Sequence, residues 1–391
     1  MGEEVSVETG MTVVLAPDKF QGCLSGPAVA AALAEGLRRV AFSTRIRTVP
    51  LADGGDGTVA ALLDRGWEPL DATVTGPDGW PVTARIARRG STAVVESATA
   101  SGLALLGGRR RPLEAGSRGV GETIAAALDA GARHVVVGVG GTACTDGGAG
   151  MLAALGARLL DADGRPVADG GGALTRVATV DLAPARQRLA GVTLTVATDV
   201  DNPLLGPHGA AAVYGPQKGA GPADVLALEA GLGHWAGVVG GDPGLPGSGA
   251  GGGLGYGLVA GLGGTVRSGV DLVLELVGFA EELVLADLVV TGEGRLDRQS
   301  LHGKAVTGVL RAVQRERESR AARGGSGPVV VGVCGANLLS AEVAGGLGFG
   351  RVWSLVERAT SPEDSIARAA VLLRAVGTEL LEALPEAPRV E

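Results

Sequence analysis

The chain is poor in several residue types on which particular functions depend. Aromatic residues make up 3% of its 391 residues, which argues against a surface on which nucleic-acid bases stack. The formal net charge of −8 argues against binding of a phosphate backbone, because such binding needs a basic surface. The three cysteines lie far apart and have neither the paired spacing of a zinc site nor that of a disulfide framework. We expect no nucleic-acid partner and a reduced, cytoplasmic environment.

Membrane signals are also missing from the sequence. No basic and then apolar leader opens the chain, and no uncharged apolar run is long enough to span a bilayer. Residues 1–10 are polar and acidic, and we expect them to form a disordered tail. The sequence predicts no membrane association and leaves a monomer and a homodimer equally open.

Lysine is scarce as well. Lys19, Lys218 and Lys304 are the lysines among 34 basic residues, and each lies in a short segment rich in glycine or acidic residues. Lysine binds phosphate as a compact point charge, so these positions are candidates for anion binding. The alternative is that they are ordinary charged residues in surface loops.

A recurring unit of strand, loop and helix organises the chain. Each apolar strand is followed by a loop rich in glycine and aspartate, and an alanine- and leucine-rich helix often comes next. This alternation predicts an α/β fold with mostly parallel sheets covered by helices, and the length suggests two domains. The clearest predicted strands are residues 12–16, 45–52, 134–139, 192–197, 286–290 and 328–333.

Helix starts and glycine-rich stretches add detail. Ser25 before Pro27 and Ser361 before Pro362 predict the first turns of two helices. Asp56 and Asp146 each precede a helical stretch and could cap it. The glycine-dense segment 244–264 indicates close backbone packing or a loop that faces a ligand.

The segment DGGDG at residues 53–57 directly follows a predicted strand. Asp53 and Asp56 could offer oxygen ligands to Mg²⁺, while the backbone amides of Gly54 and Gly55 approach a phosphate. The alternative is a tight turn with Asp56 as a helix N-cap. In parallel sheets, ligands bind beyond the carboxyl ends of the strands, and this loop is expected there.

A second acidic pair, Asp199 and Asp201, follows the predicted strand 192–197. If the strand continues, alternation places both carboxylates on one side, which suits a shared metal or acid–base chemistry. The alternative is a turn that enters Pro203. The segment also resembles the aspartate-nucleophile loop of haloacid-dehalogenase-type phosphatases.

Two further cationic positions follow predicted strands. Lys19 comes after Asp18 beyond the first strand, and Lys304 opens a helical stretch in the same connection as Arg295. Helix N-termini attract anions, so Lys304 is predicted to contact a phosphate, although it could also be a surface lysine. A Walker A loop is absent, and the formal dinucleotide pattern at 247–252 follows a proline-rich stretch instead of a strand.

Together these segments resemble the bacterial type I glycerate kinase family. The resemblance runs in family order over about residues 12–350, through stretches such as VLAPDKFQGCLS, PLADGGDGT, VVESATASGLALL, VGVGGTACTDGGAG, ATDVDNPLLGPHG and ADLVVTGEGRLDRQSLHGKA. It implies ATP-dependent phosphorylation of D-glycerate, usually to 2-phosphoglycerate, with Mg²⁺. It also implies a Rossmann-like domain built from both chain ends, an inserted α/β domain, and an active site in the cleft between them.

The chain departs from the family pattern at three positions. Gln21 stands where the family often has lysine, and Cys144 and Thr145 stand where it often has threonine and asparagine. The loss of a cation at position 21 places more weight on Lys19.

The residues and the resemblance together give a set of expected roles. The Rossmann-like domain is expected at 11–70 and 286–385, and the inserted domain at 71–285. Asp199 is predicted to orient or deprotonate the substrate hydroxyl. The remaining assignments are Lys304 and Lys19 as catalytic cations; Asp18, Lys218 and Arg295 as substrate ligands; Gly54, Gly55, Gly292 and Gly294 as nucleotide contacts; and Asp53, Asp56 and Asp201 as metal ligands.

Two functions from other classes remain as alternatives. A phosphatase that uses Asp199 as nucleophile would release phosphate without ADP. A non-catalytic protein that binds sugar acids would be stabilised by its ligand without turnover.

Overall fold

The computed structural model describes residues 10–20, 22–297 and 305–384. The chain divides into two compact units. Unit 1 joins the segment that ends at Leu51 to the segment that begins at Leu274, and unit 2 runs from Ala52 to Val273. Both units are α/β, as the alternation of strands and helices predicts. Over the described ranges, no helix is both long enough and apolar enough to cross a membrane.

A parallel sheet forms the centre of unit 1. Its three central strands are buried, mostly apolar runs because helices cover both faces of the sheet, whereas the two edge strands carry exposed polar residues. In spatial order the strands are β15 (Arg351–Ser354), β13 (Val329–Cys334), β11 (Leu288–Gly292), β1 (Thr12–Pro17) and β2 (Arg45–Thr48).

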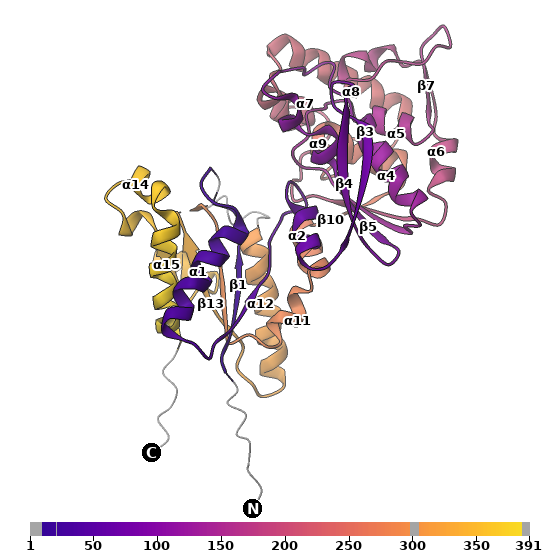
Figure 1. Cartoon of the computed structure of the whole chain (residues 1–391). Coiled ribbons are helices and arrows are strands. Elements are labelled where there is room, and N and C mark those ends of the chain that lie inside the picture. The colour runs from indigo at the N-terminus through magenta and orange to yellow at the C-terminus, as the bar shows by residue number, and fades with distance from the viewer. Residues whose placement is uncertain (1–9, 21, 298–304, 385–391) are drawn as a thin grey trace, which may run out of the picture. The chain divides into compact units, whose positions relative to one another are not determined.

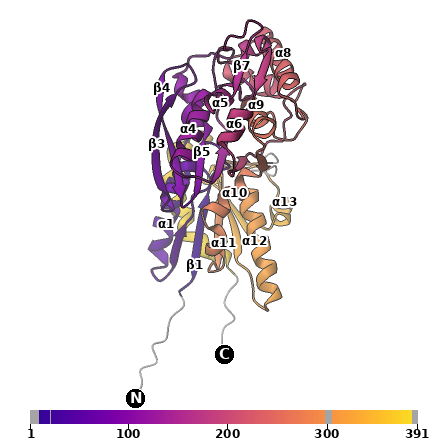
Figure 2. The same cartoon turned by 90° about the vertical axis from the view of Figure 1, so that its right-hand side faces the viewer.

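The helices of unit 1 lie on both faces of this sheet. α1 and α15 pack side by side on one face (Figure 1), where Gly36 and Gly377 let the two backbones approach closely. α12 lies on the other face (Figure 2) and packs against β11 and α11. The helices are α1 (Gly26–Val40), α11 (Phe279–Leu283), α12 (Ala305–Ala322), α13 (Ala341–Gly346), α14 (Pro362–Ala367) and α15 (Ala369–Glu379), and α10 (Gly269–Leu276) crosses the unit boundary.

The strand order of unit 1 has a switch point beside β1. The chain places β2 on one side of β1, and later adds β11, β13 and β15 in turn on the other side. Doubly wound sheets of this order bind ligands where the order reverses, beyond the carboxyl ends of the strands. Here that point is bordered by the ends of β1 and β11, where Pro17 pairs with Gly292.

Unit 2 contains a mixed sheet. Its β5, β6, β9 and β10 are parallel, and β3 and β4 form an antiparallel hairpin at one edge. In spatial order the strands are β10 (Thr265–Arg267), β9 (Thr193–Ala197), β6 (His134–Gly138), β5 (Thr92–Glu96), β4 (Pro81–Arg89) and β3 (Glu68–Thr75).

The helices of unit 2 bury a core that includes Met151, Trp235 and Tyr256. A pair of short strands, β7 (Arg158–Leu160) and β8 (Thr179–Asp181), lies outside the main sheet. The helices are α2 (Thr58–Asp64), α3 (Ser97–Ser101), α4 (Arg118–Asp129), α5 (Ala149–Ala154), α6 (Ala183–Arg188), α7 (Ala210–Tyr214), α8 (Pro222–Val239) and α9 (Ala250–Tyr256).

The unit boundaries differ from the positions expected at 70/71 and 285/286. Residues 52–70 belong to unit 2 because α2 packs against β4 and β5, and the Arg89 side chain donates to the Arg65 carbonyl oxygen. Residues 274–285 belong to unit 1 because α11 packs against α12. Both segments look like connections in the sequence, and only their packing assigns them to a unit.

The predicted helix starts at Ser25 and Ser361 are confirmed. The Ser25 hydroxyl accepts a hydrogen bond from the Ala28 amide at the start of α1, and Ser361 accepts one from the Asp364 amide at the start of α14. Each serine satisfies one of the amides that a helix N-terminus leaves without a partner.

The glycine-dense segment is used for close backbone packing. A methyl group on Gly252 would overlap the Cys144 carbonyl oxygen, and one on Gly253 would approach Gly147 closely. Both glycines also have positive φ, which side chains rarely tolerate. The segment thus packs against the loop that follows β6, one of the two interpretations open from the sequence.

The loop of residues 53–57 lies directly on the carboxyl ends of β6 and β9. A methyl group on Gly54 would lie 3.1 Å from the Ala197 side chain, and one on Gly140 would lie 3.0 Å from the Cα of Gly55. A methyl group on Gly138 would overlap the Gly54 carbonyl oxygen. The loop therefore packs tightly on the strand ends, and glycine is required at Gly138, where any side chain would overlap the loop backbone.

This packing predicts the effect of substitutions at Gly138. Gly138→Ala should lower the free energy of unfolding by about 1–3 kcal/mol, because the loop must move away from the sheet. Gly233→Ala in α8 is the matched control, since its new methyl group meets no atom within 4 Å. That control should raise stability by about 0.5–1 kcal/mol, as alanine does in a helix. Urea denaturation measures both, and equal stabilities of the two variants would contradict the packing.

Candidate active site

The parallel strands of unit 2 end at a common edge. Their register aligns Glu96 of β5 with Gly138 of β6, and Gly138 with Ala197 of β9. The 53–57 loop covers this edge and brings its two aspartates to the strand ends. Acids from segments far apart in the sequence are thereby gathered in one unit, as the sequence predicts for the edge where ligands bind.

Asp199 is held in place by the start of α10 and the residue that precedes it. Its Oδ1 accepts a hydrogen bond of 2.8 Å from the Ser268 hydroxyl, and its Oδ2 accepts one of 3.0 Å from the Val270 amide. Burial raises the pKa of this half-buried carboxyl, and the charge of Asp53 acts in the same direction, while the hydrogen bonds oppose the rise. The result is an oriented carboxylate that is a better base than an exposed aspartate.

Asp53 lies beside Asp199, on the other side of a glycine. A methyl group on Gly269 would overlap the Asp53 carbonyl oxygen and would lie 3.1 Å from Oδ2 of Asp199. The Asp53 side chain is exposed, and its Oδ1 accepts a 3.1 Å hydrogen bond from the Gly55 amide. Gly269 thus provides the space in which the two acidic residues come together.

Asp56 does not cap α2, which corrects one interpretation from the sequence. Glu96 takes that role from the end of β5, where its Oε1 accepts from the Gly57 amide at 3.0 Å and its Oε2 from the Val59 amide at 3.1 Å. Gly57 occupies the N-cap position and has no side chain to offer. The exposed Asp56 carboxyl forms a hydrogen bond with Glu96.

The pKa of Glu96 is raised in this buried position. Burial and, to a lesser extent, the neighbouring Asp56 carboxyl raise the pKa of Glu96 to about 7. The hydrogen bonds from the backbone amides of Val59 and Gly57 act in the opposite direction. The contribution from Asp56 is expected because two carboxyl groups in contact share one proton. The sequence patterns predict no role for Glu96, although its position directly at the end of an apolar strand in VVESATASGLALL is a usable signal.

Asp201 does not join this group. β9 ends at Ala197, so the alternation that would place Asp199 and Asp201 on one side does not continue. Asp201 is exposed, whereas Asp199 is half-buried. Within the ranges that the structure describes, no group of three or more histidine, cysteine, aspartate or glutamate residues is arranged to hold a metal ion.

Lys218 lies in the interior of unit 2, which does not match a cation that receives a substrate. The residue is 2% exposed, and its ammonium group donates a 2.5 Å hydrogen bond to the Cys144 carbonyl oxygen, with the Thr145 hydroxyl 3.5 Å away. Burial lowers its pKa. The lysine stabilises the glycine-rich loop after β6 through its hydrogen bond to the Cys144 carbonyl oxygen, and we assign it no substrate contact.

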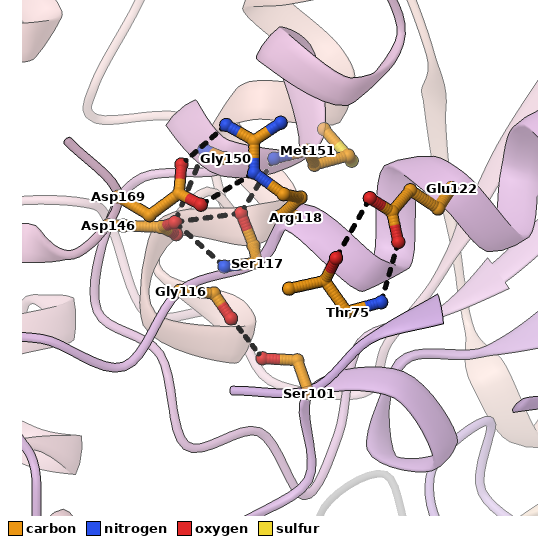
Figure 3. Close-up of polar contacts among 10 residues, drawn as sticks. All are labelled: Thr75, Ser101, Gly116, Ser117, Arg118, Glu122, Asp146, Gly150, Met151 and Asp169. Atoms are coloured by element: carbon orange, nitrogen blue, oxygen red, sulfur yellow. Dashed lines mark hydrogen bonds and ion pairs between the residues drawn. The ribbon is translucent and has the colours of Figure 1, made fainter. Parts of the chain in front are cut away.

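The same loop is anchored by Asp146 (Figure 3). This fully buried carboxylate accepts from the amide and hydroxyl of Ser117 at 2.9 and 2.8 Å, and from the amides of Gly148 and Gly150 at the start of α5. Burial raises its pKa, and these hydrogen bonds oppose the rise. Gly148 and not Asp146 occupies the N-cap position of α5, but the Asp146 side chain provides the expected hydrogen bonds to the amides at the start of that helix.

Unit 1 has a separate group of predicted residues at its switch point. The Asp18 amide donates to the Gly292 carbonyl oxygen at 2.8 Å, and the Lys19 side chain is exposed. Arg295 begins β12 (Arg295–Leu296), which pairs with β14 (Ala336–Asn337), and its Nε lies 3.2 Å from Oδ2 of Asp297.

Glycine is required at the end of β11 for packing reasons. A methyl group on Gly292 would overlap the Val333 carbonyl oxygen, and the Gly294 carbonyl oxygen accepts a 3.1 Å hydrogen bond from Ala336. Lys304 and Gln21 lie outside the described residues, so the structure places neither of them.

Comparison with known proteins identifies the family. The model of the glycerate kinase family matches residues 13–384. A glycerate kinase of Bacillus subtilis (strain 168) is 43% identical over 370 residues, which cover 92% of this chain and 94% of the relative. A glycerate 2-kinase of Escherichia coli (strain K12) is 42% identical over 315 residues, which cover 78% of this chain and 82% of the relative.

A solved structure agrees with these relatives. The crystal structure of a protein provisionally described as glycerate kinase 2 from Salmonella typhimurium LT2 has a TM-score of 0.80 and 37% identity, and the match covers 95% of this chain and 98% of that chain. The family model and the similar sequences and structure therefore agree over nearly the whole length. The chain is a kinase and belongs to the glycerate kinase family.

Proposed function

We propose that the protein transfers the γ-phosphoryl group of ATP to the 2-hydroxyl group of D-glycerate, giving 2-phosphoglycerate and ADP. The family assignment supports glycerate as the substrate, and the Escherichia coli relative is a glycerate 2-kinase. The observation that carries the chemistry is Asp199, an oriented, half-buried carboxylate at the strand ends of unit 2 with a raised pKa.

In the proposed step, the glycerate hydroxyl oxygen bonds to the γ-phosphorus while the bond between that phosphorus and the β–γ bridging oxygen of ATP breaks. The hydroxyl proton moves to a carboxylate oxygen of Asp199, and ADP leaves with the bridging oxygen. Phosphoryl transfer requires mainly positioning and neutralisation of charge. The hydrogen bonds from Ser268 and Val270 hold Asp199 in one orientation, so the base needs no rearrangement at the moment of transfer.

Mg²⁺ enters this proposal as part of the ATP complex. In kinase sites, Mg²⁺ is bound by one or two carboxylates together with the phosphates of the substrate. Of the three predicted ligands, Asp53, Asp56 and Asp201 are all exposed, and the described residues form no protein-only metal site. We therefore keep these acids as candidate contacts to the bound nucleotide complex and assign no step to the metal.

The cations of the proposal come from unit 1. Lys19, Arg295 and Lys304 are assigned to the ATP phosphates and the glycerate carboxylate, since phosphoryl transfer needs positive charge against both. Asp18 is assigned to the substrate hydroxyl groups. Backbone amides near Gly54, Gly55, Gly292 and Gly294 are assigned to the nucleotide. We expect the reaction to take place in the cytoplasm.

The two alternatives from other classes are not favoured by the family assignment. They are separated from the proposal by measuring product release and ligand-dependent stability. A coupled assay should detect ADP only when D-glycerate and MgATP are both present. Phosphate release without ADP would indicate a phosphatase, and stabilisation by glycerate without turnover would indicate a binding protein.

Asp199→Asn tests the base assignment. The amide keeps the shape of the side chain but cannot take the hydroxyl proton, so we expect kcat to fall by about 10²–10⁴-fold. Asp129→Asn is the matched control, because that aspartate pairs with Arg188 at the surface of the same unit. Steady-state rates of ADP formation give both values, and a wild-type kcat for Asp199→Asn would eliminate Asp199 as the base.

The phosphorylated position is tested by phosphorus NMR of the product. An ester on the 2-position has one proton on the adjoining carbon and gives a doublet, whereas an ester on the 3-position has two and gives a triplet. We expect the doublet. A triplet would keep the kinase assignment and replace the proposed product.

Lys304→Arg tests whether a compact ammonium group is needed. Arginine keeps the charge but is larger and planar, so we expect kcat/KM for MgATP to fall by roughly tenfold or more. Arg315→Lys, at an exposed position of α12, exchanges the same residue types in the opposite direction and should leave kinetics unchanged. Normal kinetics of Lys304→Arg would show that Lys304 is an ordinary surface charge.

A further inference from the structure

Glu96 connects the sheet of unit 2 to the loop that carries two of the candidate active-site acids. It is the last residue of β5 and is 3% exposed, yet its two carboxylate oxygens reach across to the amides of Gly57 and Val59. Gly57 is the last residue of the 53–57 loop and the N-cap of α2, and Val59 lies in the first turn of that helix. The loop is therefore bonded to the sheet at its C-terminal end by one side chain.

The N-terminal part of the same loop has no comparable side-chain anchor to the sheet among its described contacts. The Asp53 side chain bonds within the loop, to the Gly55 amide. Gly54 and Gly55 make close contacts to Ala197, Gly269 and Gly140, but such contacts limit only how near the backbone may come. Steric contacts without hydrogen bonds do not prevent the loop from lifting away from the strand ends.

We propose that Glu96 is a positioning residue of the reaction: by bonding the start of α2 to the end of β5, it holds the 53–57 loop on the sheet and keeps Asp53 beside Asp199. This inference rests on the proposed function for its kinetic consequence. Its structural part concerns only the loop and is independent of the substrate.

The geometry explains why a glutamate is needed. Both carboxylate oxygens accept an amide hydrogen, so each backbone donor at the start of the helix is satisfied inside a buried environment. The carboxyl group of Asp56 bonds to the same side chain and ties a third residue of this turn to β5. A glutamine at this position could accept from one amide only, because its NH₂ group would face the other donor.

The test compares Glu96→Gln with Glu122→Gln. Glu122 is a matched control in the same unit, since its carboxylate also accepts two hydrogen bonds from one segment, from the amide and hydroxyl of Thr75 (Figure 3).

We expect Glu96→Gln to speed hydrogen exchange of the Gly57 and Val59 amides by about tenfold or more and to lower kcat by about tenfold or more. The KM for MgATP should rise as well, because Gly54 and Gly55 of this loop are assigned to the nucleotide, whereas the KM for glycerate should change by less than about threefold. Glu122→Gln should keep kcat within about twofold of wild type.

Several results would overturn the inference. They are wild-type exchange rates or a wild-type kcat in Glu96→Gln, or an equal loss of kcat in Glu122→Gln. If Glu96→Gln does not fold, exchange in the wild-type protein decides: amides of Gly57 and Val59 that exchange as fast as in an unstructured peptide would also overturn it. If the wild-type protein phosphorylates no glycerate, the proposed function fails, and the exchange comparison still tests the positioning role.

Discussion

The contact between the 53–57 loop and the strand ends of unit 2 leaves no room for side chains. Gly138 is the last residue of β6, and Gly140 lies in the loop that follows. Gly138 meets the backbone of Gly54, and Gly140 meets the backbone of Gly55. Close packing of this kind is possible only with glycine, and an added methyl group would displace the loop. The closeness of Asp53 to Asp199 depends on that contact, because it holds the loop that carries Asp53 on the strand ends.

The charged groups around this contact differ in how deeply they are buried and in how many hydrogen-bond partners they have. Asp146 is fully buried and has four hydrogen-bond donors around it, as a buried carboxylate requires. Lys218 is equally enclosed but has one short bond to a carbonyl oxygen, and burial lowers its pKa. Asp199 is half-buried and keeps a face available, which suits a group that must exchange a proton. Degree of burial thus separates residues that hold the loops from a residue that can react.

Each unit carries a different kind of charge near the carboxyl ends of its own strands. Unit 2 gathers acids at the carboxyl edge of its mixed sheet, and unit 1 carries Lys19 and Arg295 near the switch point of its parallel sheet. Strand order explains the second location, because loops on either side of a switch point diverge and leave space for a ligand. Acids for the hydroxyl group and cations for phosphate are the two requirements of phosphoryl transfer.

The sequence by itself determined the α/β class, the discontinuous arrangement, the helix starts at Ser25 and Ser361, and the glycerate kinase family, because these depend on local patterns and on ordered motifs. It could not determine burial or long-range partners. Only the tertiary structure showed that Lys218 is enclosed, that β9 ends before Asp199, and that Glu96 and not Asp56 caps α2. Those outcomes depend on atoms brought together from positions 37 or more residues apart, which no local pattern encodes.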